Sequence, residues 1–112
     1  MRTFKALIIS DDHAVETVLR FYLLTMGCKV FTANGENTED MYNSFAPFDI
    51  VIINLPGKNV NIAKAIKYVR PITMIMAIGS NLPEMGIIDA ALSRPLKIAD
   101  LEKAIEKYFG LT

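Results

Sequence analysis

The sequence contains too little cysteine and too little net charge for several classes of protein. Its single cysteine, Cys28, cannot form a disulfide within the chain, and no Cys-x-x-Cys or cysteine–histidine spacing is typical of a metal knuckle. The 12 basic and 12 acidic residues cancel, so the chain has no surplus of positive charge for nucleic acid or an anionic membrane. We therefore expect neither a disulfide scaffold nor a domain that binds nucleic acid or a membrane.

Long apolar runs, linkers and glycine-rich loops are missing as well. The first apolar run, residues 6–10, is too short and wrongly flanked for a signal peptide or a membrane span, so we expect a cytoplasmic protein. No glycine-rich phosphate loop follows this run, and no repeat or low-complexity segment occurs in the chain. The 112 residues, 52% apolar and 21% charged, fit one small domain over residues 1–112.

Apolar runs that predict strands alternate with helical patterns along the chain. The predicted strands are residues 6–10, 29–33, 49–54, 73–79 and, more weakly, 90–93. The predicted full-length helices are residues 14–26, 37–45, 60–69 and 98–109. Between the fourth and fifth strands, residues 80–85 leave room for barely one helical turn, so we expect a shortened fourth helix there.

This alternation predicts a doubly wound α/β fold. Near-continuous apolar strands are typical of a parallel sheet that is buried on both faces, and right-handed crossovers place helices on each face. Ligands of such folds bind beyond the carboxyl ends of the strands. Ser10, Asn54 and Gly79 each end or follow a predicted strand, so we expect them at that edge.

Four segments of the chain, in order, resemble the receiver domain of bacterial response regulators. They are LIISDDHAVETVLRFYLLTMG, FTANGENTED, FDIVIINLPG and LSRPLKIADLEKAI. They are similar to the family's first strand with its acidic cluster and helix, its second strand and turn, its phosphoacceptor segment, and its lysine–proline segment with the last helix. The resemblance covers essentially the whole chain. It implies a flavodoxin-like, receiver-like (βα)5 domain of two-component signal transduction with five parallel strands.

The resemblance also places altered residues at the family's functional positions. Asn54 falls at the phosphoacceptor position, where a neutral carboxamide is a poor nucleophile and removes one charge from a cation site. Arg94 replaces the family's lysine, and Ala91 replaces its aromatic switch residue and has nothing to rotate. The threonine or serine after strand four aligns with Gly79, which fits slightly better, or with Ser80. We therefore expect Asn54 to act as a hydrogen-bonding strut and phosphorylation not to switch the protein.

The acidic cluster allows two registers and two interpretations. Without gaps, Ser10 and Asp11 align with the family's acidic pair, and we prefer this register because it also places the first strand correctly. A shift by one residue makes Asp11 and Asp12 the pair. These carboxylates suit Mg²⁺ weakly at most, and capping of the first helix is the favoured role, so we expect no cofactor. The implied degenerate phosphoacceptor pocket comprises Ser10, Asp11, Asp12, Asn54, Gly79, Ser80 and Arg94.

Arg94 offers a way to neutralise this pocket without a metal ion. Its planar guanidinium can engage a carboxylate through two hydrogen bonds, which a lysine cannot do. We expect it to reach across the sheet edge to Asp11 or Asp12.

The first helix carries a candidate surface for a partner. The residues expected to face the sheet are Val15, Val18, Leu19, Tyr22 and Leu23. Phe21 and Leu24 then lie on the far side, and two large apolar residues on a solvent face indicate a contact surface. The expected occupant is a protein of a signalling pathway or a second copy of the chain. The alternative is that a neighbouring helix covers them.

Three functions are compatible with these patterns. The favoured one is a pseudo-receiver, a non-enzymatic signalling module that lacks the phosphoacceptor aspartate and acts through protein–protein contact. The second is a small doubly wound enzyme that uses Asp11 and Asp12 for cation-assisted chemistry on a phosphorylated metabolite, although it would lack a glycine-rich phosphate loop. The third keeps phosphotransfer with Asp49 as acceptor, although Asp49 begins its strand, far from the acids.

Overall fold

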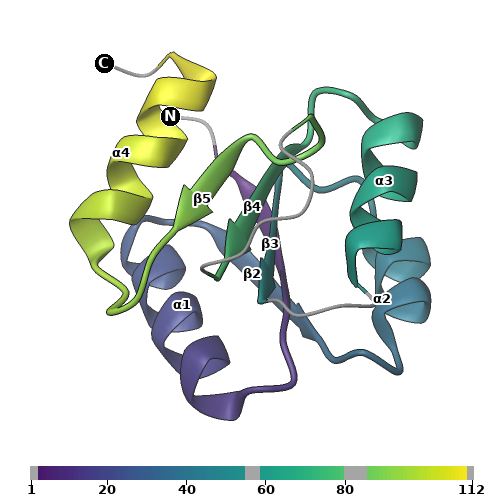
Figure 1. Cartoon of the computed structure of the whole chain (residues 1–112), viewed down its shortest axis with the longest axis horizontal. Coiled ribbons are helices and arrows are strands. Elements are labelled where there is room, and N and C mark those ends of the chain that lie inside the picture. The colour runs from purple at the N-terminus through teal and green to yellow at the C-terminus, as the bar shows by residue number, and fades with distance from the viewer. Residues whose placement is uncertain (1–2, 55–58, 80–85, 111–112) are drawn as a thin grey trace.

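The computed structural model has a five-stranded parallel sheet with helices on both faces, and it describes residues 3–54, 59–79 and 86–110 (Figure 1). Its strands are β1 (Lys5–Ile9), β2 (Lys29–Ala33), β3 (Ile50–Asn54), β4 (Met74–Ile78) and β5 (Ala90–Leu92). Its helices are α1 (His13–Thr25), α2 (Thr38–Phe45), α3 (Asn59–Val69) and α4 (Ile98–Phe109). The strands pair in parallel in the order β2-β1-β3-β4-β5, which confirms the predicted doubly wound fold.

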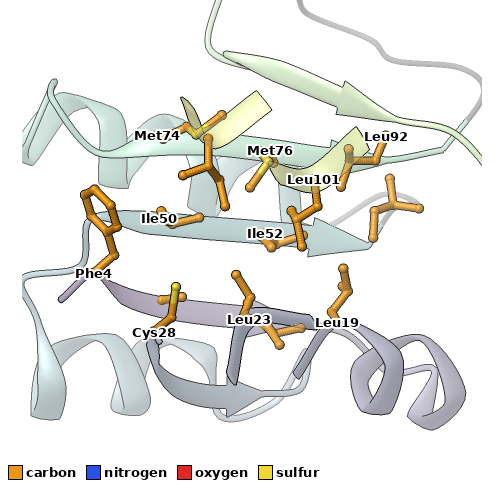
Figure 2. Packing of buried hydrophobic residues seen from close by; sticks show 14 residues of the cluster. Phe4, Leu19, Leu23, Cys28, Ile50, Ile52, Met74, Met76, Leu92 and Leu101 are labelled. Carbon is orange, nitrogen blue, oxygen red and sulfur yellow. The ribbon is translucent and has the colours of Figure 1, made fainter. Parts of the chain in front are cut away.

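Alternate residues of the central strands point into two apolar cores. In β3, Ile50 and Ile52 lie in the core with α1 and α4, whereas Val51 and Ile53 lie in the core with α2 and α3. Figure 2 shows the first core, in which Ile50 and Ile52 belong to one cluster with Leu23 of α1. Because successive side chains of a strand face opposite ways, a strand without polar residues requires helices on both faces. Burial of each large apolar side chain contributes about 1.5–3 kcal/mol.

The predicted strands and full-length helices agree with the observed ones to within one residue at each end. The shortened helix was expected within residues 80–85, which lie outside the described residues, and residues 86–89 form turns and bends before β5. The helix labelled α4 is therefore the predicted closing helix at 98–109. Among the described helices, none is both long enough and apolar enough to cross a membrane.

One residue of α1 faces the solvent against expectation. Val18, predicted to face the sheet, is 37% exposed, whereas Leu19 and Leu23 are buried. The inward stripe of a helix is narrow, and Leu19 and Leu23 with their partly buried neighbour Val15 already fill it. Val18 thus joins Phe21 and Leu24, which are 63% and 55% exposed, so no described helix covers the candidate partner surface.

Cys28 is a buried core residue. It lies in the same cluster as Phe4 and Ile50 (Figure 2). Burial raises the pKa of the Cys28 thiol, and the nearby Asp49 carboxylate raises it further. The neutral thiol is therefore favoured, which suits packing rather than nucleophilic reactivity.

Three side chains tie α3 to α4 at the amino end of β4. Lys67 Nζ donates to Asp89 Oδ2 at 2.5 Å, to the Tyr108 hydroxyl at 3.2 Å and to the carbonyl of Thr73 at 2.8 Å. Asp89 Oδ2 also accepts from the amide of Ile75 at 2.8 Å. The side chains of Lys67 and Asp89 are only 19% and 21% exposed, so water replaces these bonds poorly. The cluster therefore joins helices from opposite faces of the sheet.

Asp89→Ala should reveal the strength of this cluster. It leaves the Lys67 ammonium without its carboxylate and the Ile75 amide without an acceptor, and we expect the free energy of unfolding to fall by roughly 1–3 kcal/mol. Urea denaturation followed by circular dichroism measures the change. Asp40→Ala removes an exposed carboxylate from α2 and serves as control, with a loss below about 1 kcal/mol. Equal losses for both variants would contradict the assignment.

Candidate functional site

The carboxyl edge of the sheet brings together Ser10 after β1, Asn54 at the end of β3 and Arg94 after β5. Asn54 is only 9% exposed, and its carboxamide is bonded at both ends. Its Nδ2 donates to Ser10 Oγ at 3.2 Å, and its Oδ1 accepts from Arg94 Nη2 at 2.9 Å. A buried polar group needs such partners, so Asn54 connects the centre of the sheet to the loop after β5.

Ser10 is the second buried polar residue of this edge. Its Oγ donates to the carbonyl of Asp12 at 3.1 Å and accepts from the amide of Asp12 at 3.0 Å. The Asn54 amide is its third partner. A hydroxyl has one donor and two acceptor positions, so the Ser10 side chain is fully used. Ser10 therefore holds the β1–α1 turn against β3 and retains no capacity for a further ligand.

Asp12 is the N-cap of α1. Its Oδ1 accepts from the amides of Ala14 at 3.0 Å and Val15 at 3.3 Å, which a helix leaves without partners in its first turn. The carboxylate also lies at the positive end of the helix dipole. The capping role expected for the acidic cluster is confirmed for this residue.

Asp11 is held by a different part of the chain. Its Oδ1 accepts from the amide of Gly35, in the turn after β2, at 2.9 Å. A Cβ at position 35 would lie 3.1 Å from Asp11 Oδ2, so glycine permits this close approach. No motif in the sequence assigned Gly35 to the site. The signal for it was the Asn34-Gly35 turn, which follows β2 at the same edge of the sheet.

The predicted pairing of Arg94 with the acids is wrong among the described residues. The guanidinium bonds to the oxygen of Asn54, and no ion pair joins it to Asp11 or Asp12 in the part of the chain that the structure describes. Those carboxylates are instead bonded to backbone amides of the Gly35 turn and of α1. One oxygen of each carboxylate is thus engaged by the backbone, and Arg94 binds the neutral amide of Asn54.

The remaining predicted positions lie along β4 and β5. Ala91 is an exposed residue of β5 opposite Ala77. Gly79 follows β4 with a φ of 152°, a value that favours glycine, and its amide donates to the carbonyl of Leu92 at 3.4 Å. Ser80 lies outside the described residues. Gly79 therefore contributes backbone, and no hydroxyl, to the described part of the site.

Several polar groups at this edge of the sheet are engaged in hydrogen bonds within the chain. Mg²⁺ prefers oxygen ligands. Here Oδ1 of Asp11 and Oδ1 of Asp12 accept from backbone amides, and Asn54 Oδ1 accepts from a guanidinium. No group of three acidic, histidine or cysteine side chains in the described ranges could hold a metal ion.

Asp49 lies at the opposite edge of the sheet from Asn54. It immediately precedes β3, its Oδ2 accepts from the amide of Lys5 at 2.9 Å, and Arg70 Nη1 lies 3.9 Å from its Oδ1. Asp49 is therefore separated from Asp11 and Asp12 by the length of the strand. Phosphotransfer to Asp49 with help from those acids is ruled out by this placement.

Comparison with known proteins identifies the fold. No protein-family model and no curated protein sequence matches the chain. Solved structures do match it. The chemotaxis response regulator CheY4 of Vibrio cholerae superposes with a TM-score of 0.80 at 18% identity, covering 96% of this chain and 99% of that one. This chain has the fold of CheY-like receiver domains.

Two further receiver domains match over similar lengths. One from Clostridium thermocellum has a TM-score of 0.80 at 21% identity and covers 96% of this chain and 95% of that one. One from Methylobacillus flagellatus has a TM-score of 0.78 at 19% identity and covers 96% of this chain and 99% of that one. The receiver fold therefore extends over nearly all of the chain.

Substitutions at Asp12 separate the capping role from a role of its charge. Asp12→Ala removes the acceptor for two amides of α1 and should lower the free energy of unfolding by about 1 kcal/mol. Asp12→Asn keeps a capping oxygen but no charge, and should retain most of the stability. Denaturant titration of both variants measures the difference. Equal destabilisation by the two changes would contradict the cap as the main role of this side chain.

Proposed function

We propose that this protein is a receiver-like signalling module that is not switched by aspartyl phosphorylation and acts by contact with a protein partner. The observation that carries the proposal is the pair of hydrogen bonds that engages both ends of the Asn54 amide. The sequence resemblance aligns Asn54 with the phosphoacceptor position of receiver domains. The receiver folds that match the chain support a signalling role. The module is proposed to have no enzymatic activity of its own.

The chemistry of a carboxamide supports inertness at Asn54. Attack on a phosphoryl group needs an electron-rich nucleophile, and the amide oxygen carries no formal charge. Here that oxygen already accepts a hydrogen bond from the cationic Arg94, which withdraws electron density further. The amide nitrogen donates to Ser10, so neither end of the group is free to react.

Arg94 gives the proposed pocket a fixed conformation. Its bond to Asn54 joins the end of β3 to the loop between β5 and α4, and it needs no phosphoryl group to form. A charged donor to a neutral acceptor is a stronger hydrogen bond than one between neutral groups. We infer that hydrogen bonds within the chain stabilise the charges of the pocket. The acids accept from backbone amides, and the arginine donates to an amide oxygen.

The same proposal names a contact surface. The exposed apolar residues of α1, Val18, Phe21 and Leu24, form what we call the α1 ridge. Exposed apolar residues gathered on one helix are typical of a protein-binding surface. We propose that the partner of this module binds there.

Incubation with a small-molecule phosphodonor and Mg²⁺ tests inertness. We expect no acyl phosphate, because the acceptor position carries a carboxamide, and intact-protein mass spectrometry should show no added phosphoryl group. Asp49→Asn serves as control for phosphorylation at the other edge of the sheet. A stoichiometric gain of one phosphoryl group in the unmodified protein would overturn the proposed function.

Asn54→Asp should not by itself create a working switch. The new carboxylate faces Arg94, but Ala91 still offers no aromatic ring to reorient and Gly79 offers no hydroxyl. Amide chemical shifts of β4, β5 and α4, recorded with and without phosphodonor, should therefore remain nearly unchanged.

A titration with Mg²⁺ tests the neutralised pocket. Calorimetry should detect no binding at micromolar Mg²⁺ in the unmodified protein, because Arg94 covers the oxygen of Asn54. Arg94→Ala uncovers that oxygen and should strengthen the binding. Lys97→Ala removes an exposed positive charge of the same loop and should have little effect. Micromolar affinity in the unmodified protein would contradict the pocket described here.

A further inference from the structure

A groove lies between α2 and α3. These two helices cover the face of the sheet opposite α1 (Figure 1). It has a volume of about 410 Å³. Each helix lines it with residues at helical spacing: Thr38, Glu39, Tyr42 and Asn43 from α2, and Asn61, Ile62, Ala65, Ile66 and Val69 from α3. We call this the α2–α3 groove. Its walls are mainly apolar, and no described helix fills it.

The α1 ridge is a convex counterpart to this groove. The exposed side of α1 carries one charged residue, Arg20, at its edge. The other exposed residues there are Ala14, Thr17, Val18, Phe21, Leu24 and Thr25. Phe21 lies at the centre of this side, opposite the buried Leu19 and Leu23. Exposure of such a stripe costs free energy in water, and contact with an apolar groove removes that cost.

The charges beside the two features are opposite in sign. Arg20 is exposed next to Phe21 on α1, and it is the only lysine or arginine of that helix. Glu39 lines the groove in the first turn of α2, where Asp40 adds a second acid. An arginine at the edge of the ridge therefore matches an acidic edge of the groove, which favours one orientation of docking.

We propose that the α1 ridge of one copy of this chain docks into the α2–α3 groove of a second copy. The two features lie on opposite faces of the sheet, so they cannot meet within one chain. The contact is heterologous, so each docked pair still presents one free ridge, on one copy, and one free groove, on the other. The proposal deepens the proposed function, since it names the partner of the ridge as another copy of the protein.

The size of the two features sets the expected strength. The ridge offers only a few large side chains, so the contact is smaller than a standard interface of roughly 1,200–2,000 Å². We therefore expect weak association that depends on concentration, with copies adding head to tail. Sedimentation velocity over a range of concentrations should show average mass rising continuously, without a stop at the dimer.

Two complementary variants test the proposal. Phe21→Ser removes the centre of the ridge and leaves the groove intact, whereas Ala65→Arg blocks the groove and leaves the ridge intact. Each alone should weaken self-association by roughly tenfold or more, since loss of a central apolar contact costs over 1 kcal/mol. Mixed in equal amounts, the two variants should form a one-to-one dimer. It does not grow further, because the intact ridge of Ala65→Arg and the intact groove of Phe21→Ser are both used in that dimer.

The control for the groove is Ala99→Arg, the same substitution at an exposed alanine of α4, which should associate like the unmodified protein. Circular dichroism checks that each variant is folded. Reversal of either charge, by Arg20→Glu or by Glu39→Arg, should weaken self-association. A mixture of the two variants should associate again, because the ridge of each then meets a groove of opposite charge.

The outcomes distinguish ridge-to-groove docking from other modes of self-association. A monomeric mixture of Phe21→Ser and Ala65→Arg overturns the proposal, as does unchanged association of either variant alone. If Ala65→Arg still forms dimers, and if adding Phe21→Ser to the same chain abolishes them, then the ridges of two copies pair with each other instead. An unmodified protein that stays monomeric at every concentration also overturns the inference. Each of these results leaves phosphorylation inertness, and so the proposed function, to be decided by mass spectrometry.

Discussion

The complete burial of β3 is the constraint on which the rest of the structure depends. All five of its residues are buried, so apolar side chains must cover both faces of the sheet. Helices on both faces follow, and the parallel connections place the ends of β1, β3 and β5 at one edge. Because Asn54 ends this buried strand, its polar group must find partners inside the protein, and Ser10 and Arg94 provide them.

The neutral charge of Asn54 changes the role of its neighbours. Where an aspartate would bring a third carboxylate to the edge, the amide both donates and accepts, and can join a hydroxyl to a guanidinium. Asp11 and Asp12 each accept hydrogen bonds from the backbone through Oδ1. The Asn54 amide thus makes a hydrogen-bonded connection between β1, β3 and the loop after β5.

The two faces of the sheet differ in how completely they are closed. On one face, α1 and α4 pack over the sheet, and the outer side of α1 is mainly apolar. On the other face, α2 and α3 line a groove. At the amino edge, the bonds of Lys67 to Asp89 and Tyr108 hold α3 and α4 in fixed positions.

The sequence by itself determined the order of the elements, their limits and the presence of an amide at the end of β3. Apolar periodicity and turn residues carry that information locally, which is why the predicted strands and full-length helices agree with the structure. Only the tertiary structure decided that Arg94 binds Asn54 rather than an acid, that Gly35 holds Asp11, and that Val18 is exposed. These outcomes depend on which of several nearby partners is within hydrogen-bonding distance and on how wide a stripe of a helix its neighbours cover. No spacing along the chain specifies those distances.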